Sequence, residues 1–284
     1  MQTVLSEESH TPEPMEITTL IKTAMFNREP LNEVDSTQWK LILEKIAVPP
    51  STGCVSRPRL GALLEQSLAS CTSTIITGRA GSGKTTLAID FAERAGRAVA
   101  WYKVDAPESK LTIFFQYLIS SIRVQRPGFG SYALIPLLNE ELDNNQIPLL
   151  AELFAYELER SSGSALLAVI EDLHLVSDAD WVVMFFRRLL PLLPSEVHML
   201  ITSRTVPPAP LWRMRSKQTL SVIDEETLLF TKDEAITLFH QYGLTRQQAS
   251  IALDHSHGRA AALLSLAATL RFADTEGVIS WKLV

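Results

Sequence analysis

Residues 78–86 read Gly-Arg-Ala-Gly-Ser-Gly-Lys-Thr-Thr, which fits the phosphate-loop pattern G-x-x-x-x-G-K-[ST]. The glycines allow backbone angles that turn successive N–H groups toward phosphate oxygens. Lys84 can then reach the β- and γ-phosphates of a nucleotide, and the hydroxyl of Thr85 is a ligand for Mg²⁺. The stretch therefore predicts a nucleoside triphosphate site with these binding residues: Gly78, Arg79, Ala80, Gly81, Ser82, Gly83, Lys84, Thr85 and Thr86.

The sequence around this loop has the secondary structure that such a loop requires. A β-branched run precedes it at 72–77, and residues 86–92 have helical periodicity. This context argues against the alternative, a glycine-rich turn that contains a lysine by chance. Further strands are expected at 98–104, 165–170, 197–202 and 218–223. Helices are expected at 39–46, 58–68, 110–124, 149–160 and 178–193, and an irregular segment at 127–145. The alternation predicts the α/β class, with a doubly wound parallel sheet.

Strand patterns end at residue 228, and helix signals take over. Thr231 with Glu234 and Thr245 with Gln248 have the spacing of capping boxes that open two helices. A third helix, rich in Ala and Leu, follows Gly258. We therefore expect a flexible extension and linker at 1–49, a nucleotide-binding domain at 50–228 and a small helical module at 229–284.

Charge is concentrated at the N-terminus. Residues 1–36 contain seven acidic and two basic residues, a net charge of −5, which leaves only −1 of the total charge of −6 for the remainder. The acidic, weakly periodic segment is expected to be disordered, and the nearly neutral body lacks the basic stripe of a nucleic-acid-binding surface. Two cysteines fit a reducing compartment. No signal peptide and no apolar run of 18 residues is recognisable, so the expectation is a cytoplasmic protein without a membrane partner.

Two further segments have the composition of a metal- and water-binding half-site. Glu171 and Asp172 end the apolar strand at 165–170, where carboxylates can hold Mg²⁺ together with Thr85 and orient a water molecule. The alternative is a pair of solvated carboxylates at a strand end. Arg204 ends the next strand and is a candidate sensor of the γ-phosphate, although an arginine at a strand end is often merely solvated. The predicted catalytic residues are Asp172, Glu171 and Arg204.

Several short segments together resemble one family of regulators. The segments are Arg57-Pro-Arg-Leu60, the phosphate loop, Trp101-Tyr-Lys-Val-Asp105, Glu171-Asp-Leu-His174, Thr202-Ser-Arg204, Pro207-Pro-Ala-Pro-Leu211 and Arg213-Met-Arg215. In this order the chain resembles the signal-transduction ATPases with numerous domains (the STAND class), in the MalT-like branch of the large LuxR-type regulators. The resemblance covers roughly residues 50–272, and the Ser-Arg-x-x-Pro-Pro segment is its most branch-specific part.

The resemblance implies a sheet of the ASCE type, in which the phosphate-loop strand lies beside the strand that ends in Arg204. It also implies binding of ATP or ADP with Mg²⁺, and oligomerisation on activation. By position, Asp172 matches the water-orienting acid and Arg204 the sensor, while Arg57 and Arg59 lie where family members approach the base.

The chain departs from the family pattern in three places. Glu171 stands where the metal-side carboxylate is usually Asp, which bears on hydrolysis more than on binding. Gly258 is followed by Arg259 instead of Trp. Family members also continue into a repeat region and a DNA-binding domain beyond the 284 residues of this chain, so direct DNA binding is not expected of it.

Three functions are compatible with these features. The leading hypothesis is a signalling switch that binds ATP or ADP, hydrolyses ATP slowly and controls self-association or contact with a regulatory protein, in a transcription-regulatory pathway. The second is a turnover enzyme, either a remodelling ATPase of the AAA+ type or a phosphotransferase, for which Arg213 and Arg215 are candidate arginine fingers. The third is a scaffold that binds nucleotide without hydrolysing it.

Overall fold

A computed structural model describes residues 41–51, 55–139, 142–161 and 163–275. The acidic segment 1–36, for which the sequence predicts disorder, lies outside these ranges. None of the helices within them combines the length and apolarity needed to cross a bilayer.

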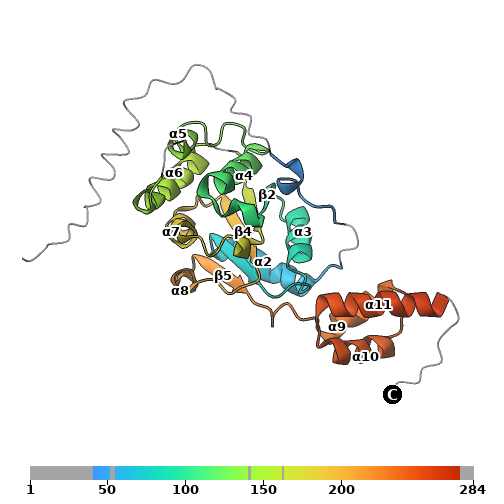
Figure 1. Ribbon diagram of the computed structural model, residues 1–284. Helices are drawn as coiled ribbons and strands as arrows, with labels where there is room; N and C mark the ends of the chain where they lie inside the picture. The colour runs from blue at the N-terminus through green and yellow to red at the C-terminus, as the bar shows by residue number, and fades with distance from the viewer. Residues whose placement is uncertain (1–40, 52–54, 140–141, 162, 276–284) are drawn as a thin grey trace, which may run out of the picture. The chain divides into compact units, whose positions relative to one another are not determined.

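Five parallel strands form one sheet in the order β2-β3-β4-β1-β5 (Figure 1). The strands are β1 (Ser73–Thr77), β2 (Ala98–Lys103), β3 (Leu166–Glu171), β4 (Val197–Ser203) and β5 (Leu220–Ile223). The phosphate-loop strand β1 pairs with β4, and Thr77 at its end lies opposite Ser203. The order confirms the predicted parallel sheet and the predicted neighbour of β1. It also brings the carboxyl ends of β1, β3 and β4 to one edge.

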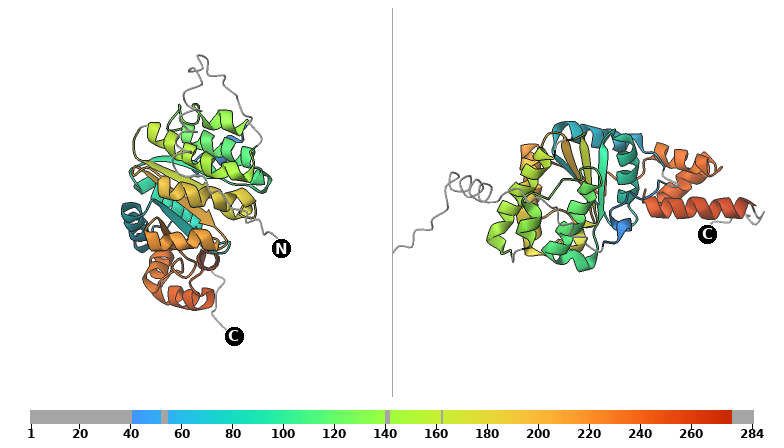
Figure 2. Two further views of the ribbon diagram at one scale, coloured as in Figure 1. Left: turned by 90° about the vertical axis from the view of Figure 1, so that its left-hand side faces the viewer. Right: turned by 90° about the horizontal axis from the view of Figure 1, so that it is seen from above.

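Helices cover both faces of the sheet, α2 and α3 on one side and α4, α6 and α7 on the other (Figure 2). The helices of this part are α2 (Pro58–Ser70), α3 (Lys84–Arg94), α4 (Leu111–Arg123), α5 (Leu134–Leu138), α6 (Ile147–Arg160), α7 (Asp180–Leu189) and α8 (Ala209–Trp212). Short 3-10 turns are η1 (Leu43–Lys45), η2 (Ala106–Ser109), η3 (Asn144–Gln146), η4 (Leu173–Leu175), η5 (Leu190–Leu192) and η6 (Arg213–Lys217). Because both faces are covered, every residue of β1, β3 and β4 is buried.

Three expectations about local structure were wrong in part. The segment 127–145, expected to be irregular, contains α5, whose Leu134 and Leu138 are buried against the rest of the core. The expected helix at 178–193 ends as α7 at Leu189 and continues only as a 3-10 turn, because Pro191 lacks the N–H that would extend the helix. Within the described part of 39–46, only the three residues of η1 are helical.

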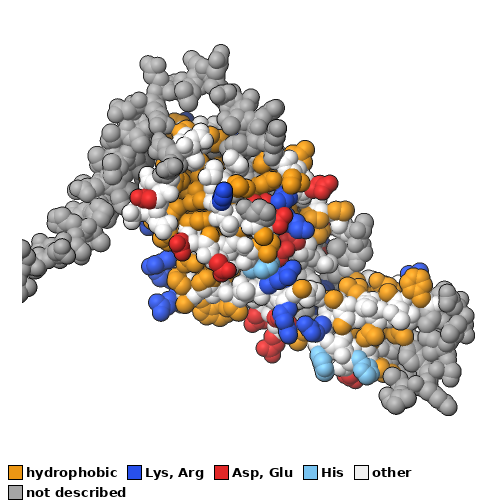
Figure 3. Space-filling model, in the orientation of Figure 1, with side chains coloured by type: hydrophobic (Ala, Val, Ile, Leu, Met, Phe, Trp, Pro, Cys, Tyr) orange, Lys and Arg blue, Asp and Glu red, His pale blue; other side chains and the backbone are white. Residues whose placement is uncertain are grey.

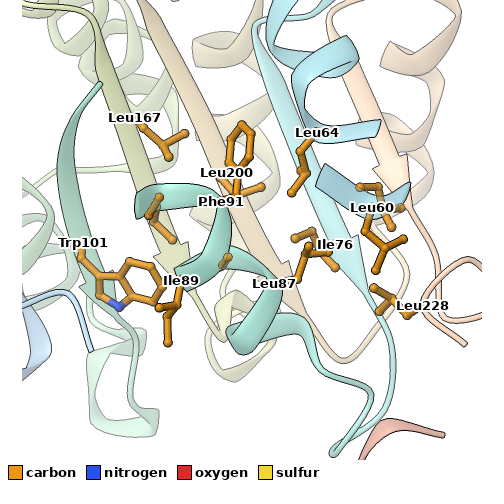
Figure 4. Packing of buried hydrophobic residues seen from close by; sticks show 14 residues of the cluster. Leu60, Leu64, Ile76, Leu87, Ile89, Phe91, Trp101, Leu167, Leu200 and Leu228 are labelled. Carbon is orange, nitrogen blue, oxygen red and sulfur yellow. The ribbon is translucent and has the colours of Figure 1, made fainter. Parts of the chain in front are cut away.

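The core that supports the phosphate loop lies between the sheet and the pair α2–α3 (Figure 4). Leu87 and Phe91 lie one turn apart on α3 and point toward the sheet, where Leu200 is buried in β4. Leu60 and Leu64 of α2 pack in the same layer. This packing fixes α3, and therefore the end of the loop from which α3 begins.

The opposite face of the sheet is filled by aromatic side chains. Tyr102 of β2 contacts Phe114 of α4 edge-on, with ring centroids 5.2 Å apart. Phe115 contacts Phe185 at 4.7 Å, and Phe154 contacts Phe185 at 5.7 Å, so α4, α6 and α7 share one aromatic layer. Edge-to-face pairs of this kind add to the stability gained by burying apolar surface.

Three C-terminal helices have a buried cluster of their own, which includes Leu238, Phe239 and Leu263. They are α9 (Lys232–Gln241), α10 (Arg246–Ser256) and α11 (Ala260–Thr275). Both predicted capping boxes are present: the Thr231 hydroxyl accepts from the N–H of Glu234, and the Thr245 hydroxyl from that of Gln248. We call α9–α11 the helical module, and the segment 224–230 that joins it to β5 the linker.

Candidate nucleotide site

One cavity of about 450 Å³ lies at the edge of the sheet where β1, β3 and β4 end. Its walls come from the phosphate loop and α3, the ends of β3 and β4, the segment before α2, and the helical module. The lining residues are Val55, Arg57, Ala80, Gly81, Gly83, Lys84, Thr85, Thr86, Leu87, Asp90, Asp172, Arg204, Phe230, Ala260, Ala261 and Leu264. Figure 3 shows basic and acidic side chains gathered where the sheet-containing part meets the module.

The phosphate loop depends on glycine at two of its predicted positions. Gly81 has φ +76° and Gly83 has φ +92°, in the left-handed region that disfavours residues with a Cβ. A Cβ on Gly81 would also lie 2.8 Å from the Cβ of Ala261. Gly83 occupies the N-cap of α3, so the helix begins at Lys84 and its free N–H groups point into the loop.

Lys84 lies beneath the loop that precedes it. Its Nζ donates hydrogen bonds to the carbonyl oxygens of Gly78 at 2.6 Å and Arg79 at 3.0 Å. The side chain is buried, and burial lowers the pKa of the ammonium although Asp172 acts in the opposite direction. A buried ammonium gains most from a nearby anion, which is what a phosphate at this loop would provide.

Glu171 and Thr85 form the part of the site that fits Mg²⁺. The hydroxyl of Thr85 donates to Oε1 of Glu171 at 2.5 Å. The other oxygen, Oε2, is buried and has no hydrogen-bond partner among the described residues. An unpaired buried carboxylate oxygen is unfavourable unless a cation or donor meets it. No set of three Asp, Glu, His or Cys side chains surrounds a common point in the described ranges.

Asp172 turns the chain at the end of β3. It has φ 60°, a left-handed conformation that Asp tolerates better than most residues, and its N–H donates to the Thr202 hydroxyl on β4 at 3.0 Å. The turn ends the alternation of the strand, so that Glu171 reaches Thr85 while Asp172 lines the same cavity. Nδ1 of His174 lies 3.6 Å from Oδ1 of Asp172.

Arg204 follows β4 and lines the cavity with an exposed side chain. No hydrogen bond or ion pair of its guanidinium is formed within the described ranges, so it is free to meet an added anion there. The two candidate arginine fingers lie elsewhere. Arg213 and Arg215 belong to η6, outside the cavity lining, and the guanidinium of Arg215 lies 4.4 Å from the ring centroid of Trp212.

Arg57 and Arg59, predicted to lie near the base, both bind the linker. Arg57 lines the cavity, but its guanidinium donates to the carbonyl oxygens of Leu228 and Leu229, and it lies 4.0 Å from the ring centroid of Phe230. Arg59 is not part of the lining and donates to the Thr227 and Leu229 carbonyl oxygens. Burial lowers the pKa of Arg57 against the opposing effect of Glu234.

The helical module supplies a wall that sequence reasoning missed. The N–H of Ala261, at the start of α11, donates to the carbonyl oxygen of Gly81 in the phosphate loop at 3.0 Å. Ala260 and Leu264 of the module line the cavity as well, next to Phe230 of the linker. Small apolar side chains give no local signal of a site, and only the folded chain brings them within reach of residues about 180 positions earlier.

The linker supplies a second contact that was missed. Oε2 of Glu225 accepts a hydrogen bond from the backbone N–H of Arg79 at 3.0 Å, and Oε1 accepts from its Nε at 2.8 Å. These bonds lower the pKa of the Glu225 carboxyl. One carboxylate thus ties the linker to the first variable residue of the phosphate loop.

Comparisons with known proteins show which proteins this chain is similar to. No family model matches the chain. It is 32% identical over 207 residues to the serine/threonine-protein kinase PknK of Mycobacterium tuberculosis, covering 69% of this chain and 18% of that protein. It is 29% identical over 235 residues to the transcriptional regulator MalT of Serratia proteamaculans, covering 80% of this chain and 25% of that protein. The chain therefore spans a quarter or less of the length of these relatives.

A solved structure shares the fold. The STAND protein with a tetratricopeptide repeat sensor from Pyrococcus horikoshii matches with a TM-score of 0.51 and 17% identity, over 84% of this chain and 34% of that one. This chain has a five-stranded parallel sheet in the ASCE order, with the loop pattern and the strand-end carboxylates on the predicted elements. The chain is thus a relative of the MalT regulators over most of its own length, and it has the P-loop NTPase fold.

Proposed function

We propose that the cavity binds ATP and ADP with Mg²⁺, and that the chain is a nucleotide-operated switch in a regulatory pathway. The observation that supports the proposal is that the walls of the cavity come from two parts of the chain. Lys84 and Thr85 come from the sheet-containing part, whereas Ala261 and Leu264 come from the helical module. A nucleotide bound between them contacts both parts, so a change in its phosphates alters their relative stability.

The site chemistry suits a nucleoside di- or triphosphate. The volume of about 450 Å³ lies in the range of small-molecule pockets. Loop N–H groups, the N-terminus of α3 and the Lys84 ammonium provide donors for phosphate oxygens. Thr85 and Glu171 would hold Mg²⁺, which would supply positive charge to offset the negative charge of the phosphates.

The same residues would also hydrolyse ATP. Asp172 accepts a proton from a water molecule whose oxygen attacks the γ-phosphorus, and the bond to the β–γ bridging oxygen breaks, giving ADP and phosphate. Lys84 and Arg204 stabilise the charge that develops on the phosphoryl oxygens. We expect slow turnover, because Arg204 is the one arginine of the described lining without a partner, and the candidate fingers Arg213 and Arg215 lie outside the cavity.

The regulatory setting rests on the relatives. MalT is named a transcriptional regulator and PknK a protein kinase, and this chain matches only a fraction of each. We propose that the chain performs the nucleotide-dependent step in such a pathway, through self-association or contact with a regulatory protein. DNA binding would come from another chain or another segment.

Calorimetric titration with ATP and ADP tests the proposal directly. The parent is expected to bind both, and Lys84→Ala should weaken ATP binding by more than about tenfold, since a charge–phosphate contact contributes at least 1.4 kcal/mol. Lys110→Ala removes an exposed lysine outside the cavity and is the matched control. Affinities of the parent and Lys84→Ala that agree within about threefold would reject the phosphate loop as the binding site.

A further inference from the structure

Asp90 is an acidic side chain in the cavity that neither the phosphate site nor the metal site uses. It lies on α3, is 9% exposed and belongs to the cavity lining. Its Oδ1 forms an ion pair with Nη2 of Arg94, at a distance of 2.7 Å. A carboxylate can accept about four hydrogen bonds, and within the described ranges this ion pair is the one polar contact of the group. The second oxygen is therefore available to a donor inside the cavity.

The position of Asp90 along α3 indicates which part of a nucleotide it meets. Asp90 is six residues after Lys84, and at 1.5 Å per residue the two Cα atoms are separated by about 9 Å along the helix axis. Helical side chains lean toward the N-terminus, so the carboxylate lies nearer to the loop than its Cα does. For a nucleotide that extends along α3 from phosphates at Lys84, this distance corresponds to the sugar. Thr86, one turn earlier on the same face, also lines the cavity.

Other residues that line the cavity are not free acceptors of this kind. Leu87, Leu264 and Phe230 present apolar surface. Arg57 is a donor, and its guanidinium is already bound to the linker carbonyls and Glu234. Asp90 is thus the acidic acceptor on the α3 wall beyond the phosphate loop, and a ribose with two adjacent hydroxyl groups offers the matching donors.

We propose that Asp90 accepts hydrogen bonds from the ribose hydroxyls of the bound nucleotide and so makes the site selective for ribonucleotides. The proposal rests on the proposed nucleotide site and adds its sugar specificity. Arg94 acts as a positioning residue, because its ion pair holds the carboxylate in place from the exposed side of the helix.

The test is calorimetric titration of the full chain with ADP, with 2′,3′-dideoxy-ADP and with inosine diphosphate. The parent should bind the dideoxy nucleotide about tenfold more weakly than ADP, the range of a hydrogen bond to a charged group. Asp90→Asn should bind ADP about tenfold more weakly and distinguish the two sugars by less than about threefold. Glu93→Gln removes an exposed acid of the same helix and should behave as the parent.

Arg94→Gln separates recognition from a structural role. It removes the ion pair without changing the cavity lining, so the sugar preference should remain above about threefold. Equal loss of preference in Arg94→Gln and Asp90→Asn, with lowered melting temperatures in both, would mean that Asp90 is structural. If Asp90→Asn keeps the sugar preference, or changes only the response to inosine diphosphate, the ribose assignment is wrong. A parent that binds no nucleotide at all rejects the proposed function instead.

Discussion

The two neighbouring carboxylates at the end of β3 have different surroundings, and this difference separates their roles. Glu171 is 3% exposed and accepts the Thr85 hydroxyl, while its other oxygen has no partner within the described ranges. Asp172 is half-buried and lines the cavity. We therefore propose that Glu171 holds a cation and that Asp172 orients a water molecule.

Exchanging each carboxylate for its amide tests this assignment. Asp172→Asn should reduce phosphate release to the blank while ATP affinity stays within about threefold of the parent, because an amide oxygen is a much weaker proton acceptor. Glu171→Gln should instead reduce the enhancement of ATP binding by Mg²⁺. Phosphate release and calorimetry with and without Mg²⁺ provide the two readouts. Exchanged phenotypes would mean that the roles are reversed along the strand.

A buried histidine in the core, His198, affects the stability of the fold and is not part of the nucleotide site. His198 of β4 is 2% exposed; its Nδ1 lies 3.2 Å from the carbonyl oxygen of Cys71 and its Nε2 2.9 Å from the Thr74 hydroxyl. A carbonyl can only accept, so Nδ1 carries the proton and Thr74 donates to Nε2. Ser67 then donates to Thr74 at 2.6 Å. The chain of bonds is complete only with a neutral imidazole, and burial lowers the pKa of His198 to about 4.

This histidine should make the fold sensitive to mild acid. The unfolded chain protonates His198 near pH 6.5, whereas the folded chain does so only near pH 4. Stability is therefore full above pH 6.5 and is lost as the pH falls toward 4, by about 2 kcal/mol between pH 6.5 and 5. Urea unfolding at these two pH values should show the loss in the parent and in the exposed-residue control His255→Gln, but a smaller loss in His198→Gln. Identical pH dependence in all three proteins would contradict the assignment.

At the scale of elements, the linker leads into the helical module and also contacts the phosphate loop. Arg57, at the N-cap of α2, donates to the linker carbonyl groups, and Glu225 binds Arg79 of the phosphate loop. Glu225 also places a negative charge near the phosphate loop. This charge acts to raise the pKa of Lys84, against the effect of burial. The hydrogen bonds of Glu225 therefore hold the phosphate loop in its observed conformation, whereas the negative charge of Glu225 repels a bound anion.

Neutralising Glu225 should favour the nucleotide. Glu225→Gln removes the repulsion between the carboxylate and phosphates, so ATP should bind about two- to fivefold more tightly, and the gain should shrink as salt is raised. Glu226→Gln changes the neighbouring exposed acid and serves as the control. Calorimetry at low and high salt measures both. Weaker ATP binding by Glu225→Gln would show that the Arg79–Glu225 pair preorganises the loop for nucleotide.

The sequence predicted the elements of this fold better than it predicted the walls of the site. Periodicity identified the strands and the main helices, and both capping boxes were recognisable because their partners are three residues apart. The short helix α5 was missed because its burial depends on distant contacts. The residues of the phosphate-loop pattern are contiguous and could be predicted to bind phosphate, whereas Glu225, Phe230 and Ala261 approach the loop only through tertiary folding.

At the scale of the whole described body, two buried clusters meet at one cavity. The cluster around α2 and α3 supports the phosphate loop, and the cluster of α9–α11 supports the opposite wall. A γ-phosphate can shift the equilibrium between two arrangements only through contacts that differ between them. Arg204 is the free cation of the described lining and follows the strand beside β1, so it is the residue we expect to make such a contact.

The measurement that tests the switch most directly is light scattering of the full chain with ADP and with a non-hydrolysable ATP analogue. The parent should form a larger assembly with the ATP analogue than with ADP. Arg204→Ala should bind ADP within about threefold of the parent yet have one size with both nucleotides, while Arg213→Ala, which changes an arginine outside the cavity, should respond as the parent does. A parent whose size is the same with both nucleotides would contradict the switch, and an Arg204→Ala variant that responds like the parent would show that Arg204 is not its sensor.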